Sequence, residues 1–138
     1  MDNSKKITRK EMREEAFKLS FELLLNDSPL DEIVDNANEA DDINYSEYAL
    51  DCANGILQHK DELDEYIAKY LKTGWKLSRI SKVSYAILRL ALYEILYVDS
   101  VPTPVAINEA VELAKKYTIP DDSSFINGIL GNFVKDNG

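Results

Sequence analysis

The chain has 138 residues, of which 45% are hydrophobic and 30% charged, a composition typical of one soluble globular domain and not of a disordered tail. Its apolar runs are too short to span a membrane, its N-terminus lacks the apolar core of a signal peptide, and its single cysteine, Cys52, excludes an internal disulfide. We therefore expect a cytoplasmic protein. The net charge of −9, taken alone, argues against nucleic acid as a partner.

The charge is unevenly distributed, and this changes the argument about nucleic acid. Residues 1–13 carry a net charge of +3, residues 14–70 carry −13, and residues 71–138 carry +1. A basic tip on an acidic body indicates two different partners. The alternative for the acidic middle is a surface that simply keeps a small protein soluble.

The apolar periodicity is helical almost throughout, so the sequence predicts an all-α protein. We expect a first helix over residues 8–25, with Thr8 as its N-cap and Glu11 completing a capping box. The helices expected next cover residues 30–38, 45–58 and 61–71, with an acidic loop at 39–44 between the first two of these.

The central helix is expected over residues 82–97, because that segment is apolar nearly all round. Pro102 and Pro104 then fix the backbone at the entry to a helix over residues 104–117. Proline suits the first helical turn, where its missing N–H is not needed.

The last helix is expected over residues 123–135, with Asp121 or Asp122 as its N-cap. No linker divides the chain into separate domains. The sequence therefore predicts a single domain of about seven helices, built of two packed subunits that cover roughly residues 1–73 and 74–138.

The sequence offers little for catalysis. His59 is the only histidine, and with Cys52 alone nearby it lacks the ligands that a metal site needs, so a surface or capping role is favoured. No glycine-rich phosphate loop ending in Lys-Ser or Lys-Thr is present. We expect no enzyme, no cofactor and no metal site.

The basic residues at the start of the first helix share one face, because they follow i, i+3, i+4, i+7 spacing: Lys6, Arg9, Lys10 and Arg13. Cations are disfavoured at a helix N-terminus, where the dipole is already positive. Their presence there favours an anionic partner, and we take these residues as candidates for contact with it. The alternative is a frayed and solvated end.

The C-terminal half carries a specific succession of motifs. AILRLALYE is followed by a short link, by VP, by VAINEAVELAKK and then by DSSFINGIL. This order resembles the NusB transcription antitermination family. The resemblance covers essentially the whole chain and is strongest over residues 75–134.

The resemblance implies a helical bundle of two packed three-helix units. It also implies two binding partners, boxA RNA and the small-subunit ribosomal protein that serves as NusE. With them the chain would join the RNA polymerase antitermination complex on rRNA operons. Relatives differ in being monomers or dimers, so a homodimer stays open, and no membrane partner is expected.

The resemblance assigns site residues as well. Arg9, Lys10 and Arg13 match the arginine-rich N-terminus that meets RNA in the family, although Glu11 and Met12 dilute the run. Asp121 and Phe125 match positions near the RNA at the start of the last helix. For Phe125 two readings stay open, a stacking face for a base or a place in the core.

Two further residues match the interface with the ribosomal protein. Ser84 stands where relatives often carry an acidic residue that faces this partner, which puts that one contact in doubt. Phe21 stands where an aromatic residue commonly borders the same interface.

Asn108 and Glu94 are expected to be polar groups satisfied inside the junction between the central helix and the next one. Direct contact of Asn108 with RNA or partner is the alternative. For the chain as a whole, the alternatives to an antitermination factor are an RNA-docking module related to RsmB-type rRNA methyltransferases and a helical scaffold without an RNA role.

Overall fold

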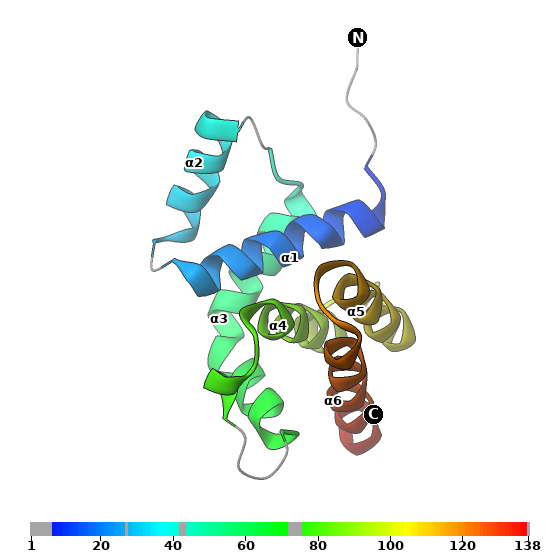
Figure 1. Cartoon of the computed structure of the whole chain (residues 1–138). Coiled ribbons are helices and arrows are strands. Elements are labelled where there is room, and N and C mark those ends of the chain that lie inside the picture. The colour runs from blue at the N-terminus through cyan, green and yellow to red at the C-terminus, as the bar shows by residue number, and fades with distance from the viewer. Residues whose placement is uncertain (1–6, 27, 42–43, 72–75, 138) are drawn as a thin grey trace.

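The computed structural model describes residues 7–26, 28–41, 44–71 and 76–137. Six α-helices and one 3-10 turn make up this part of the chain: α1 Arg9–Leu25, α2 Leu30–Asp41, α3 Glu47–Lys69, η1 Leu77–Arg79, α4 Lys82–Tyr97, α5 Thr103–Tyr117 and α6 Pro120–Asn137. The described residues contain no strand, which confirms the predicted all-α class (Figure 1).

Helix α4 lies at the centre of the bundle, where it packs against α1, α3, α5 and α6 (Figure 1). Six of its apolar side chains are buried in the core: Ala86, Ile87, Leu88, Leu90, Ala91 and Leu92. Full burial of one large aliphatic side chain contributes about 1.5–3 kcal/mol, so this helix carries much of the core. The prediction of a central helix over residues 82–97 is confirmed.

The start of α1 has the capping box that the sequence predicts. The backbone N–H of Glu11 donates to Oγ1 of Thr8 at 3.0 Å, and the backbone N–H of Thr8 donates to Oε1 of Glu11 at 2.9 Å. Two N–H groups at the helix end are thereby satisfied, which fixes where α1 begins.

The prediction of two helices over residues 45–71 is wrong, because α3 runs without a break from Glu47 to Lys69. The expected junction at His59 contains neither proline nor glycine, and its residues are compatible with a helix. The buried row also continues across it, from Ile56 to Leu63 and Ile67. Packing against α1 and α4 therefore favours one long helix.

The N-terminus of the last helix also differs from the prediction. Helix α6 begins at Pro120, so Asp121 and Asp122 lie in its first turn and do not cap it from outside. Proline is well suited to the first helical turn, and carboxylates there are stabilised by the helix dipole. The placement of Pro104 in the first turn of α5 is confirmed.

The predicted junction between the central helix and α5 is half correct. Glu94 is buried, with 1% of its surface exposed, as expected. Asn108 is exposed, so its expected place inside the junction is wrong. The buried residues of α5 include Ala106 and Ala110, and a residue two positions from each of them points to the opposite side of a helix.

Candidate RNA and protein interfaces

The first turn of α1 presents two basic side chains to solvent. Arg9 and Lys10 are both exposed, and they lie between Thr8 and Glu11, the two residues of the capping box. The guanidinium carbon of Arg9 lies 4.5 Å from the centroid of the Tyr48 ring, which belongs to α3. Lys6 falls outside the described residues. Arg9 and Lys10 therefore form the described part of the predicted basic tip.

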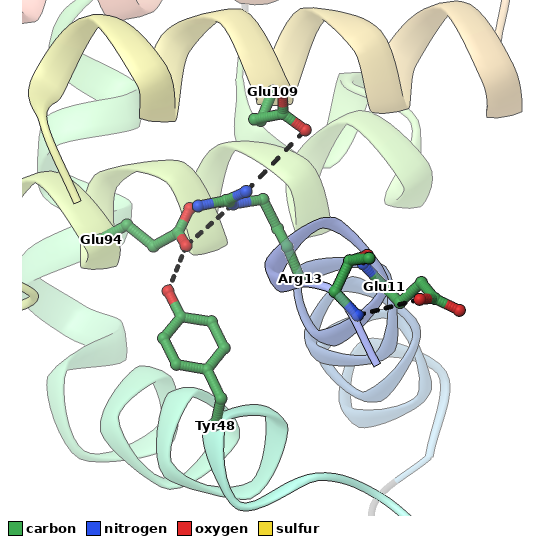
Figure 2. A network of polar contacts seen from close by, with 6 residues as sticks. Glu11, Arg13, Tyr48, Glu94 and Glu109 are labelled. Carbon is green, nitrogen blue, oxygen red and sulfur yellow. Dashed lines mark hydrogen bonds and ion pairs between the residues drawn. The ribbon is translucent and has the colours of Figure 1, made fainter. Parts of the chain in front are cut away.

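Arg13 does not join this exposed pair, although the basic spacing groups it with Arg9 and Lys10 as a candidate for RNA contact. Only 3% of its surface is exposed. Its Nε donates to both carboxylate oxygens of Glu94 on α4, at 3.0 and 2.9 Å. Nη1 lies 3.8 Å from Oε1 of Glu109 on α5 (Figure 2). Arg13 therefore joins three helices from inside and is not placed to contact a phosphate.

The burial of Arg13 has a sequence signal that the basic spacing conceals. Arg13 precedes Ala16 and Phe17 by one helical turn and Ser20 by two, and all of these side chains are buried. It belongs to the buried stripe of α1 as much as to the basic face. Glu94 is the second part of the signal. It lies inside the apolar central helix, and a buried carboxylate needs a cationic partner such as Arg13.

Tyr48 completes the buried network. Its hydroxyl donates to Oε2 of Glu94, so this one carboxylate accepts hydrogen bonds from α1 and from α3 (Figure 2). Burial opposes the charge of Arg13, but the hydrogen bonds and the charge of Glu94 outweigh it and raise the pKa of Arg13. Burial and the same carboxylate raise the pKa of the Tyr48 hydroxyl. Arg13 stays charged and Tyr48 stays protonated throughout the neutral range.

The cysteine beside this network is not a reactive group. Cys52 is buried and unbridged, and burial together with the charge of Glu94 raises the pKa of its thiol to about 12. A thiol needs to ionise to act as a nucleophile or a metal ligand. Cys52 therefore serves the packing of α3.

A groove of about 820 Å³ runs between the start of α4 and one side of α6. It brings together three of the predicted site residues, Ser84, Asp121 and Phe125. Ser84 is 1% exposed, and its hydroxyl has no hydrogen-bond partner among the described residues. Phe125 is half-buried and packs against the core while lining the groove. Phe125 therefore packs partly in the core, and its role as a stacking face for a base stays a prediction.

The groove also contains residues that the sequence analysis did not single out. Arg79 of η1 and Gly128 of α6 both line it and both are exposed. An added Cβ at Gly128 would meet no atom within 4 Å, so this wall of the groove is open. No spacing in the sequence pairs η1 with α6, and only the fold places them together.

Phe21 does not line this groove. It is half-buried on α1, with its ring centroid 6.3 Å from that of Phe17. Phe17 in turn lies 5.0 Å from Tyr117 at the end of α5. The predicted site residues that the structure describes are thus divided between the basic tip, the buried network of Arg13, the groove and this aromatic row.

The described residues contain no cluster of metal-ligating side chains. None of their His, Cys, Asp and Glu side chains gather in groups of three or more that could hold a metal ion. His59 lies within α3, stacked on Tyr97 with ring centroids 4.2 Å apart, and 3.8 Å from Glu62. Among the described helices, none is long and apolar enough to cross a membrane.

Comparison with known proteins decides between the readings of this bundle. A model described as the NusB family matches residues 10–135. The chain belongs to the NusB family. The transcription antitermination protein NusB of Acetivibrio thermocellus is 50% identical over 129 residues, which cover 92% of this chain and 88% of that protein.

Solved NusB structures share the fold. NusB of T. maritima is 32% identical and superposes with a TM-score of 0.81, over 96% of this chain and 94% of that one. A chain from a complex of the antitermination factors NusB and NusE with double-stranded RNA is 27% identical, with a TM-score of 0.80, over 93% of this chain and 96% of that one. The NusB fold is therefore established for the described residues, and the basic tip and the groove are features of a NusB surface.

Proposed function

We propose that this chain is a transcription antitermination factor that binds boxA RNA together with the ribosomal protein NusE, on rRNA operon transcripts. The observation that carries the proposal is its 50% identity to a NusB antitermination protein over 92% of the chain. The similar complex that holds NusE and RNA supports both partners. The relatives matched are named antitermination proteins, so a methyltransferase docking module is not favoured.

In this proposal the basic tip is the RNA-binding end. Arg9 and Lys10 are exposed at the N-terminus of α1, where the helix dipole adds partial positive charge. Arginine matches phosphate with its planar fork and stacks on unpaired bases. The rest of the molecule is acidic overall, with a net charge of −9 for the whole chain, and so opposes RNA elsewhere.

The groove between α4 and α6 is the docking place for the ribosomal protein. Asp121 and Phe125, which the resemblance places near the RNA, are assigned here to the ribosomal protein instead. The reason is that Asp121 and Asp122 at the rim repel phosphates but attract a basic protein. Phe125 and Ile129 supply the apolar area that the centre of a protein interface needs. Ser84 then lies at the base of this interface. Phe21 does not line the groove, so its contact with the ribosomal protein stays a prediction.

The assembly proposed here is non-enzymatic and cytoplasmic, and it includes the RNA polymerase antitermination complex. A homodimer is a further state that the same surfaces allow. The two subunits expected at residues 1–73 and 74–138 stay a prediction, with α4 as the helix that joins them.

The test is a titration of labelled boxA RNA with the chain alone and with NusE added. We expect weak binding by the chain alone, because its net charge opposes RNA outside the basic tip, and binding at least about tenfold tighter with NusE, a gain of roughly 1.4 kcal/mol. A scrambled single strand and a boxA duplex serve as controls. Equal affinity with and without NusE would contradict the two-component function.

A further inference from the structure

The exposed guanidinium of Arg9 rests on an aromatic ring. Its central carbon lies 4.5 Å from the centroid of the Tyr48 ring, within the range of a cation–π contact. An arginine that stacks on an aromatic ring offers it the flat face of the guanidinium, and the N–H donors in its plane then stay available. Among the described residues, no hydrogen bond or ion pair to another side chain holds these donors. The ring therefore orients the Arg9 side chain and leaves its N–H groups free to bind a ligand.

The Tyr48 ring is itself held in place. Its hydroxyl donates to Glu94, and Glu94 is fixed by the two hydrogen bonds from Arg13 (Figure 2). The first turn of α3 is tied to α1 as well, because the backbone N–H of Ser46 donates to Oε1 of Glu15 at 2.8 Å. The position and tilt of the Tyr48 ring are thus fixed by contacts of α3 with α4 and α1.

We propose that Tyr48 is a positioning residue for RNA binding, which acts by holding the Arg9 guanidinium in the orientation that meets the RNA backbone. This inference rests on the proposed function. A free arginine side chain samples many rotamers, and the entropy of fixing it is lost when RNA binds. Because the Tyr48 ring already restricts the Arg9 side chain in the free protein, less entropy is lost when RNA binds. The buried network therefore contributes to RNA binding although none of its members touches RNA.

A purely structural role for Tyr48 predicts something different. In that case its replacement lowers stability and leaves the RNA affinity of the folded protein unchanged. The two roles are separated by a double-mutant cycle on RNA affinity between Tyr48 and Arg9.

The cycle uses Tyr48→Leu, Tyr48→Phe, Arg9→Ala and the double variants, each titrated with boxA RNA in the presence of NusE. Tyr48→Leu is expected to weaken binding by about 2- to 10-fold, the cost of immobilising one long side chain. In the Arg9→Ala background the same change is expected to have no effect. Tyr48→Phe keeps the ring but loses the hydrogen bond to Glu94, so its loss of affinity is expected to be smaller than that of Tyr48→Leu.

Tyr85→Leu is the matched control. The guanidinium carbon of Arg89 lies 4.6 Å from the Tyr85 ring, but this arginine is paired with Asp64 and lies away from the tip. Its loss removes an equivalent contact and is expected to leave RNA affinity unchanged. An equal loss for Tyr48→Leu with and without Arg9, or no loss at all, overturns the inference while the proposed function stands. Absence of any boxA binding by the unchanged protein with NusE overturns the function instead.

A second measurement needs no substitution. Nuclear relaxation of the arginine Nε–H bonds in the free protein is expected to show Arg9 clearly more ordered than Arg79, which is also exposed but has no ring contact among the described residues. Equal mobility of the two arginines overturns the inference, whatever the variants do.

Discussion

Replacing Arg13 with methionine is expected to lower the free energy of unfolding by about 3–5 kcal/mol. The substitution keeps most of the side-chain volume but leaves the carboxylate of Glu94 buried without its cation. Such an unpaired charge costs far more than an exposed ion pair contributes. Urea unfolding followed by circular dichroism measures the change, with an unchanged m-value as the sign of an intact folded state.

Lys10→Met is the control for this prediction, because it removes a positive charge three residues away at an exposed position. It is expected to change stability by less than about 0.5 kcal/mol. Adding Glu94→Gln to Arg13→Met is expected to recover part of the loss, since the amide is neutral and its oxygen still accepts from Tyr48. A loss below about 1 kcal/mol for Arg13→Met alone would show that Arg13 is not the structural partner of Glu94.

Replacing Gly128 with arginine is expected to weaken the binding of NusE by roughly 100-fold, or about 3 kcal/mol. Gly128 lines the groove, and no atom lies within 4 Å of the added Cβ, so the substitution adds a long charged side chain at the groove without a clash at its Cβ. There it obstructs the apolar centre and repels a basic partner. Calorimetric titration with NusE measures the loss.

Gly131→Arg is the matched control on the same helix. Its added Cβ also meets no atom within 4 Å, but Gly131 is not among the groove residues. Both changes remove a helical glycine and are expected to stabilise α6 slightly. Equal NusE affinity for the two variants would place the ribosomal protein on another surface.

The sequence predicts best those features whose residue pattern is compatible with only one local structure or one position in the fold. The segment at 82–97 is apolar on every side, and only a central position buries it. The capping box at Thr8 and Glu11 is equally local, because both hydrogen bonds lie within one turn. These features needed no information from the rest of the chain.

The sequence predictions are wrong where contact with a residue distant in the sequence determines whether a side chain is buried. Arg13 carries the same charge as its neighbours Arg9 and Lys10, and only the approach of α4 with Glu94 makes it a buried residue. Asn108 was assigned to the junction by its motif, although its place in the helix turns it outward. The groove joins η1 with α6, and no local pattern encodes such a meeting.

The central claim is that RNA is held by the exposed residues at the start of α1. It is tested most directly by a salt titration of boxA binding, with NusE present, for the unchanged chain and for the Arg9→Ala, Lys10→Ala double variant. For single-stranded RNA each lost phosphate contact flattens the slope of log K against log salt by roughly 0.7, so we expect a flattening of roughly 1.4 together with weaker binding at every sequence tested. An unchanged slope and an unchanged affinity would show that this end is only solvated and that the RNA surface lies elsewhere.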